Sequence, residues 1–228
     1  MRRNLLNILA LETSTEYCSV ALWQDGAVDG SEAHVVQSHS ERLLAMVDAL
    51  LARHGMNFAA LDAIAFGEGP GSFTGLRIAC GVTQGLAFAA NLPVIGVGTL
   101  LAMAHATRAE RVICCVDARM QEIYHAAYER NGECWVARHE PGVYPPHAAP
   151  LPANGGWLGC GNAFSVYRDS LLSRYDSVLG AVDERIHARA HEIAQLAAPM
   201  FERGDIRDAA AAAPLYVRDK VALKSHER

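Results

Sequence analysis

The sequence of 228 residues predicts a two-lobed α/β protein with mixed sheets. Apolar strand-like runs alternate with helical patterns in the order β-β-β-α-β-α-β-α, and the same order begins again near residue 111. In each half an apolar strand ends in a carboxylate, Glu12 or Asp117, and a polar turn and a second strand follow. This repeat indicates a weak internal duplication. We therefore expect two lobes, at residues 1–108 and 109–228.

Three strands are predicted at the start of the first half. Residues 5–12 and 17–23 are rich in β-forming side chains, and a Thr-Ser-Thr-Glu turn joins them. Asp25 and Gly26 mark a turn into a third strand at 28–36.

A helix is predicted after the third strand. Ser38 and Glu41 have the spacing of a capping box, in which each side chain bonds the backbone N–H of the other residue. A broad apolar arc continues to Leu51, and Gly55 is a typical C-terminal stop.

Residues 61–90 form the most informative segment. A buried strand at 61–66 leads into the glycine-rich turn GEGPGSFTG and then into a helix at 74–90. Gly81 and Gly85 lie inside that helix, where each costs about 1 kcal/mol relative to alanine. With Ala89 they form a stripe of small residues at a spacing of four, which allows another backbone to approach closely. A phosphate, this chain's own core and a second protein are the three surfaces that fit such an approach.

Phosphate binding is disfavoured by the residues after the turn. Gly75 is followed by Leu76 and Arg77, so the Lys of a P-loop is missing. A dinucleotide fold would place a carboxylate at the end of the next strand, and the strand predicted at 93–97 has none.

No charged residue occurs from residue 78 to 107, which raises the possibility of a membrane span. Gln84, Asn91 and Pro93 interrupt the run. A buried helix, the strand at 93–97 and a second helix at 99–107 are the better interpretation.

The second half predicts a strand at 112–117 and a partner strand that ends near Gly132. Five prolines make residues 139–156 a loop-rich excursion, and short helices are expected near 162–173 and 187–203.

Composition limits the classes of function. Net charge is −5 and the pI is about 6.0, so a basic face for nucleic acid is not evident. Six cysteines occur without a C-x-x-C pair. This pattern favours buried thiols in the reducing cytosol over a disulfide framework or a zinc site.

The words ALETST, SHSERLL, GEGPGSFTGLRI, DARMQEIY and PLYVR, spread over nearly the whole chain, resemble the TsaB (YeaZ) family. The layout is similar to that of the actin, hexokinase and Hsp70 superfamily, whose lobes are ribonuclease H-like. The resemblance implies a cytoplasmic, non-catalytic partner subunit that needs no cofactor. Such a subunit binds the catalytic subunit TsaD, which transfers a threonylcarbamoyl group to the tRNA adenosine beside the anticodon. The small ATPase TsaE completes the complex, TsaB-type chains self-pair when TsaD is absent, and tRNA is reached only through the complex.

The helix at 74–90 is apolar around most of its circumference and therefore needs cover on two sides. We expect the chain's own sheet to cover one side and a partner to cover the other, together with the preceding helix. The expected interface residues are Ser40, Leu43, Met46, Val47, Leu50, Thr74, Arg77, Ile78, Gly81, Val82, Gly85 and Ala89. In a competing interpretation, Gly81 and Gly85 pack against this chain's own sheet. Arg77 either faces solvent or pairs with a partner or with Glu68.

An enzyme is the alternative class. Actin-like nucleotide sites use carboxylates at paired strand ends, which here are Glu12 and Asp117, for an ATPase or a carbamoyl-transferring reaction. The turns after them lack glycine, which leaves little room for a phosphate. The simpler interpretation is that both carboxylates bond neighbouring amides.

A metal site is a second alternative. His187 and His191 have the i, i+4 spacing of two ligands on one helix face, but a third ligand is not apparent. We expect them to be surface residues of a helix and to hold no functional metal.

Overall fold

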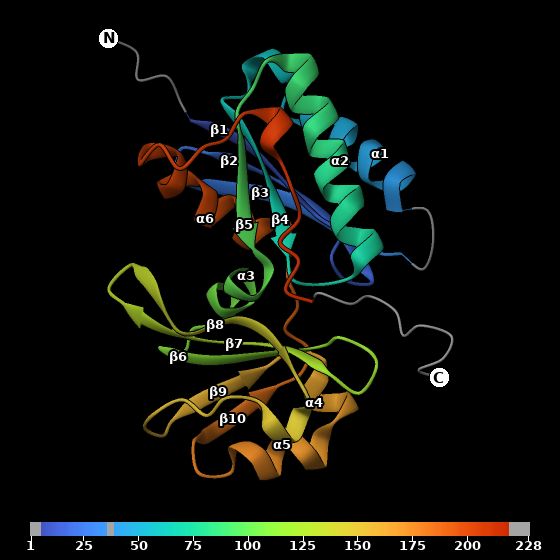
Figure 1. Ribbon diagram of the computed structural model, residues 1–228. Coiled ribbons are helices and arrows are strands. Elements are labelled where there is room, and N and C mark those ends of the chain that lie inside the picture. Colours follow the sequence, from blue (N-terminus) through green and yellow to red (C-terminus); the bar gives the residue numbers. More distant parts are fainter. Residues whose placement is uncertain (1–5, 36–38, 219–228) are drawn as a thin grey trace.

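The computed structural model describes residues 6–35 and 39–218, which form two lobes, each built on a five-stranded sheet (Figure 1). The strand order is β3-β2-β1-β4-β5 in the first sheet and, from its β8 edge, β8-β7-β6-β9-β10 in the second. In both sheets the first three strands in this order pair antiparallel and the remaining pairings are parallel. The shared order confirms the predicted two-lobed α/β fold with mixed sheets and its duplication.

The elements of the first half follow the predicted order closely. They are β1 (Asn7–Glu12), β2 (Tyr17–Gln24), β3 (Ala27–His34), α1 (His39–Arg53), the short 3-10 helix η1 (Phe58–Ala60), β4 (Ala63–Gly69), α2 (Phe73–Ala90), β5 (Val94–Gly98) and α3 (Thr99–Ala106). Ser38, the predicted cap of α1, lies outside the described residues.

The second half departs further from the prediction. Its elements are β6 (Arg111–Asp117), β7 (Ile123–Asn131), β8 (Cys134–Tyr144), η2 (Pro146–Ala148), β9 (Trp157–Cys160), α4 (Ala163–Val166), α5 (Arg168–Tyr175), β10 (Leu179–Asp183), α6 (Ala190–Glu202) and η3 (Ala209–Ala211). The expected loop at 139–156 is wrong for 139–144, which belong to β8. Pro141 is tolerated there because β8 is an edge strand. The short strands β9 and β10 were not predicted.

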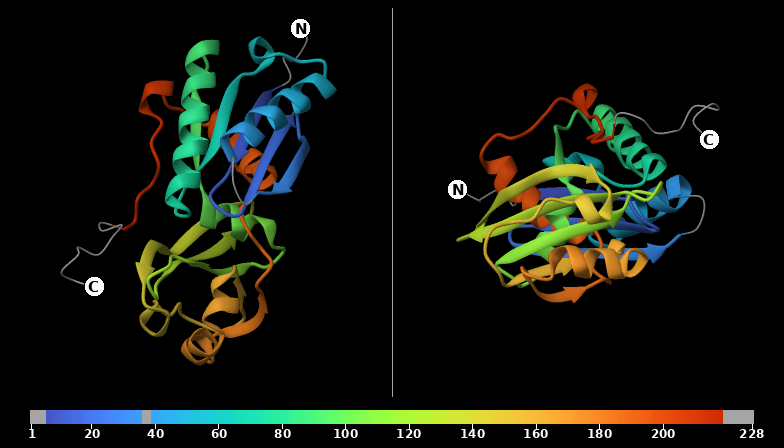
Figure 2. Two further views of the ribbon diagram at one scale, coloured as in Figure 1. Left: turned by 90° about the vertical axis from the view of Figure 1, so that its right-hand side faces the viewer. Right: turned by 60° about the horizontal axis from the view of Figure 1, so that its bottom comes forward.

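The first sheet is covered by helices on both faces (Figure 1). Alternate strand residues such as Leu9 and Leu11 pack under α1 and α2, while Ile8 and Ala10 pack under α6. The alternation follows from the period of two along a strand. Figure 2 shows α1 and α2 side by side on the same face.

Each half supplies a helix that packs on the other half's sheet. α3 follows the first sheet in sequence and lies between the two sheets. Its Leu100 and Met103 join Val112 and Cys114 of the second sheet in one buried cluster, whereas Ala102 belongs to the cluster of the first sheet. α6 follows the second sheet but packs on the first, where Ile193 is part of the buried cluster. A division at residue 108 therefore separates the strands, whereas each half supplies a helix to the other half's sheet.

A buried polar network lies on the other side of the second sheet. His125 is fully buried, with its Nδ1 atom 3.0 Å from the Tyr175 hydroxyl and its Nε2 atom 3.3 Å from Nδ1 of His139. Burial lowers the pKa of His125 to about 3, and the nearby His139 and Arg174 act in the same direction. The folded protein therefore holds His125 neutral at pH 7.

We expect the free energy of unfolding to fall as the pH drops from about 6.5 towards 3, by up to about 1.4 kcal/mol per pH unit. Over this range the unfolded chain binds a proton at His125 that the folded chain does not bind, so acid favours the unfolded state. Urea denaturation at about pH 7.5 and about pH 5 measures the slope. His125→Gln should flatten it, whereas the exposed control His147→Gln should not. An unchanged slope in His125→Gln would refute this assignment.

Candidate functional site

The glycine-rich turn packs against this chain's own first turn. A Cβ atom on Gly75 would overlap the carbonyl oxygen of Thr13, and one on Gly71 would lie 2.7 Å from the Cβ of Ser14. The Thr13 hydroxyl donates to the Gly75 carbonyl (2.7 Å), and the Ser72 N–H donates to the Ser14 carbonyl (2.8 Å). Of the three surfaces considered for this turn, the chain's own core is therefore the one it meets.

Gly81 and Gly85 behave differently. Both are exposed, and a Cβ atom on either would meet nothing within 4 Å. The competing interpretation, in which they pack against this chain's sheet, is therefore wrong. Their conformational cost brings no internal contact, because they lie on the outward face of α2.

The outward face of α2 runs along the whole 18-residue helix and is largely exposed. Its members repeat at three and four residues, as one side of a helix requires. They are Thr74, Arg77, Ile78, Gly81, Val82, Gly85, Phe88 and Ala89, of which Ile78 and Val82 are half-buried and the others exposed. Phe88 is 78% exposed and was not predicted. Its spacing of seven from Gly81 and three from Gly85 would have placed it on this face.

The expectation for α1 is largely wrong. Leu43, Met46, Val47 and Leu50 are buried in the core beneath α1 and cannot line a surface. The apolar arc of α1 is the side that covers the sheet, so it is already occupied by packing on β2 and β3. The outward side of α1 consists of Ser40, Leu44, Ala45, Asp48, Ala49 and Ala52. Only Ser40 of the expected α1 residues belongs to it.

Arg77 is exposed, as one expectation had it, and does not pair with Glu68. Its guanidinium lies 3.9 Å from the centre of the Phe73 ring, and its Nε atom donates to the Tyr216 hydroxyl (2.9 Å). Glu68 pairs instead with Arg207 at 2.9 Å. The first turn of α2 is therefore tied to the C-terminal part of the chain.

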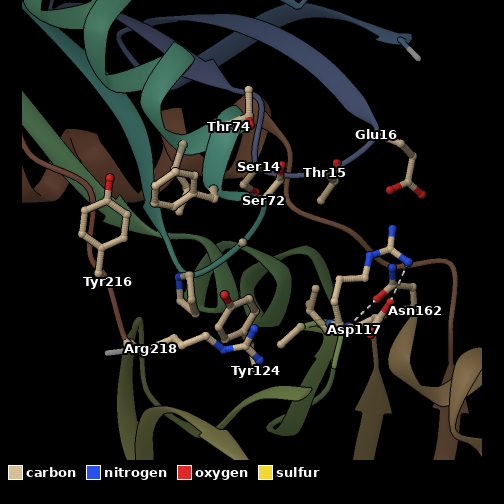
Figure 3. A pocket seen from close by; sticks show the side chains of 18 of the residues that line it. Ser14, Thr15, Glu16, Ser72, Thr74, Asp117, Tyr124, Asn162, Tyr216 and Arg218 are labelled. Carbon is tan, nitrogen blue, oxygen red and sulfur yellow. Dashed lines mark hydrogen bonds and ion pairs between the residues drawn. The ribbon is translucent and has the colours of Figure 1, made fainter. Parts of the chain in front are cut away.

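A cavity of about 910 Å³ separates the lobes (Figure 3). Ser14 and Ser72 of the first lobe face Asp117 and Tyr124 of the second across it. Residues 215–218 form a further side. The alternative of a nucleotide-binding enzyme requires Glu12 and Asp117 to face a shared cavity, so the two carboxylates must be located relative to this one.

Glu12 does not line this cavity. Its side chain is buried, with 1% of the residue exposed. One carboxylate oxygen accepts from the Ser14 N–H, and the other has no hydrogen-bond partner among the described residues. That second oxygen lies against Gly67, where a Cβ atom would overlap it. Burial raises the pKa of the Glu12 carboxyl. The polar edge that faces the cavity comes instead from Ser14 and the two residues after it.

Asp117 does line the cavity but is fully engaged. Its carboxylate accepts from the Arg119 N–H (2.9 Å) and the Tyr167 hydroxyl (3.0 Å), and it pairs with the Arg119 guanidinium (3.1 Å). Its own N–H donates to Asn162 (2.9 Å). The two strand-end carboxylates therefore bond neighbouring groups and do not form a joint pair.

Glu12→Gln is expected to raise the melting temperature at about pH 8, with a smaller gain at about pH 5. A carboxyl whose pKa is raised on folding stabilises the folded state only in acid, and this contribution is lost as the pH rises through the folded pKa. Glutamine keeps the acceptor for the Ser14 N–H without a buried charge. Thermal denaturation tests this, with the exposed Glu133→Gln as control. A destabilised Glu12→Gln at pH 8 would contradict it.

The predicted histidine pair does not share a helix. α6 begins at Ala190, so His187 lies in the preceding linker, where it stacks on Tyr17 (4.1 Å) and pairs with Glu32 (3.0 Å). His191 is exposed on α6. Within the described residues no three His, Cys, Asp or Glu side chains gather as metal ligands would.

Two further expectations concern the chain as a whole. Five of the cysteines are buried and unpaired, and Cys134 is exposed. Among the helices of residues 6–35 and 39–218, none is long and apolar enough to cross a membrane. The uncharged run from 78 to 107 instead forms α2, β5 and α3, as predicted.

Comparison with known proteins gives consistent results. Residues 33–156 match the family described as tRNA N6-adenosine threonylcarbamoyltransferase, TsaD. The tRNA threonylcarbamoyladenosine biosynthesis protein TsaB of Escherichia coli K12 is 37% identical over 228 residues, covering 96% of this chain and 97% of that protein. The protein of the same name from Haemophilus influenzae is 47% identical over 130 residues, 55% of each chain.

Solved structures agree over both lobes. A Pseudomonas aeruginosa protein described as similar to the peptidase YeaZ superposes with a TM-score of 0.87 at 38% identity, covering 93% of this chain and 100% of its own. A structure described as YeaZ from the same organism superposes with a TM-score of 0.86 at 38% identity. The match covers 92% of this chain and 99% of that one. These matches cover both five-stranded sheets and the five sequence words quoted above. The chain therefore belongs to the TsaB (YeaZ) family.

Proposed function

We propose that this chain is a non-catalytic subunit in the formation of tRNA threonylcarbamoyladenosine, and that it binds and activates a TsaD-type catalytic subunit together with TsaE. The outward face of α2, with the outward side of α1 beside it, is the proposed docking surface. In the absence of TsaD the same face pairs two copies of this chain. The relatives' shared name, tRNA threonylcarbamoyladenosine biosynthesis protein TsaB, supports the pathway.

The observation that carries the docking proposal is the exposed face of α2. Ile78, Val82 and Phe88 present apolar surface along it, and Gly81 and Gly85 leave open space between them. Exposed apolar patches of this kind mark protein interfaces. A partner helix crossing at the two glycines would approach the α2 backbone closely, and two helices from each protein would form a small four-helix contact.

The absence of catalysis by the isolated chain is supported by the state of the two carboxylates. Glu12 is buried away from the cavity, and the Asp117 carboxylate is held by an ion pair with Arg119. The turn after Glu12 packs directly on Gly71 and Gly75, which leaves no space for a phosphate between the two turns. A bound phosphate would have to push these turns apart. These features weigh against the alternative of an ATPase or a carbamoyl-transferring enzyme.

The proposal also assigns tRNA contact to the complex and places the chain in the cytoplasm. A net charge of −5 favours weak binding of RNA by the isolated chain.

Reconstitution tests the function. Purified TsaD, TsaE, threonylcarbamoyl-adenylate and tRNA are combined with and without this chain, and modified adenosine is measured by mass spectrometry. We expect modification to depend on the chain, and we expect calorimetric titration of the isolated chain with ATP to give no binding. Modification by TsaD and TsaE at full rate without this chain would refute the activating role. Turnover of ATP by the chain alone would favour the enzyme alternative.

A further inference from the structure

The last described residues form a C-terminal strap, defined here as residues 203–218, which runs from the end of α6 to the second lobe (Figure 1). Arg207 pairs with Val94 through two main-chain hydrogen bonds of 2.9 Å and so covers the open edge of β5. Further along, the Leu215 N–H donates to the Glu68 carbonyl (2.6 Å). The strap is thus anchored first on the sheet of the first lobe.

The strap next contacts the first turn of α2. Tyr216 accepts from Arg77 Nε, and its ring centre lies 5.7 Å from that of Phe73. Because the guanidinium also lies over the Phe73 ring, these three side chains form one cluster of aromatic and cation–π contacts.

The strap then crosses to the second lobe. The Arg218 guanidinium pairs with the Glu122 carboxylate, at the start of the strand β7, and its Nη1 atom lies 3.6 Å from the Met120 sulfur. The Arg218 side chain is only 12% exposed, so the pair is less screened by water than a surface ion pair. Residues 215–218 also line the cavity between the lobes.

Two covalent linkers also join the lobes, one through α3 and one through residues 184–189 before α6. Around these linkers α3 packs on α6, and His187 contacts Tyr17 and Glu32 of the first lobe. Figure 3 shows Tyr216 and Arg218 on the opposite side of the cavity from Asp117 and Asn162. We propose that the C-terminal strap is an interlobe latch, and that release of residues 215–218 opens the cavity by letting the lobes move about the two linkers. This inference is independent of the proposed function.

The latch contacts are few and local, which is typical of segments that open without global unfolding. One main-chain hydrogen bond, one aromatic cluster and one ion pair hold residues 215–218, whereas each linker leads directly into a helix packed in a core. Removing the Tyr216 and Arg218 side chains should therefore release the latch and leave both cores intact.

The experiment measures the separation of the lobes in the full chain. Spin labels are placed at Ala59→Cys on η1, outside the proposed docking surface, and at Val166→Cys on α4, both exposed, in a Cys134→Ser background that leaves only buried cysteines. Pulsed electron resonance then compares the parent with the latch variant Tyr216→Ala/Arg218→Ala. We expect a longer and broader distance distribution in the variant, and about tenfold faster hydrogen exchange at the Leu215 amide.

The matched control is Arg203→Ala/Asp205→Ala, which removes an exposed ion pair inside the strap and no contact between lobes. It should reproduce the parent distribution. If circular dichroism shows the latch variant unfolded, Glu122→Gln removes the same ion pair from the second lobe and should give the same change at smaller size. A folded latch variant with parent distances and parent exchange, or a Glu122→Gln protein with both unchanged, would overturn the latch.

Discussion

Gly75→Ala is expected to destabilise the protein by about 3 kcal/mol or more, the upper range for overpacking a close-packed site. The added methyl group would overlap the Thr13 carbonyl oxygen, which is backbone and cannot rotate away. Relief would require moving either the turn after β1 or the first turn of α2, and both are held by the hydrogen bond from Thr13 to Gly75. The cost therefore includes that bond and the packing around it.

Gly81→Ala is the matched control, because it makes the same change in the same helix. Its Cβ meets nothing within 4 Å, so we expect stabilisation by about 0.5–1 kcal/mol from helix propensity. Urea denaturation of the two variants measures the contrast. Equal stabilities of the two variants, or a Gly75→Ala protein as stable as the parent, would show that the turn after β1 does not pack closely on α2.

Val82→Glu is expected to abolish pairing through α2 and weaken TsaD binding by at least about 2 kcal/mol, roughly thirtyfold. Val82 is half-buried at the centre of the outward face, and a docked partner would bury the new carboxylate without a counter-charge. Gly81→Leu should act sterically at the same place, by filling the open space that the glycine leaves. Light scattering of the free chain and calorimetry with TsaD measure the two effects.

Two companion variants separate binding from folding. Val136→Glu makes the same chemical change at an exposed position on β8 of the second lobe and should leave pairing and TsaD binding unchanged. Phe88→Ala removes a ring that is 78% exposed, so it should weaken binding without lowering the melting temperature. Unfolding of Val82→Glu together with normal binding by Phe88→Ala would point to an internal role for this face. Normal binding by folded Val82→Glu would place the interface elsewhere.

The sequence by itself determined the fold class and most of the first lobe. Strand and helix periods are local properties, and the repeat of an apolar strand ending in Glu12 or Asp117 was sufficient to predict the duplication. The glycines inside α2 were recognised as costly enough to need an explanation, but the sequence left open whether a partner or the chain's own sheet lies beside them.

Tertiary structure alone decided which apolar surfaces were already covered. Periodicity identified the apolar arc of α1, formed by Leu43, Met46, Val47 and Leu50. The sequence pattern of an apolar helix face is the same whether the chain's own sheet or a partner covers it. The packing of α3 and α6 on the other half's sheet was undetectable for the same reason, since both helices carry ordinary apolar faces.

The partner of Arg77 was decided by contacts distant in sequence. Tyr216 lies 139 residues away, and no local pattern couples the two positions. The glycine turn shows the same limit: its sequence required a close neighbour, but the neighbour proved to be Thr13 and Ser14, which are brought there by the parallel pairing of β1 with β4. Local sequence thus specified where close approach occurs, and only the folded chain specified what approaches.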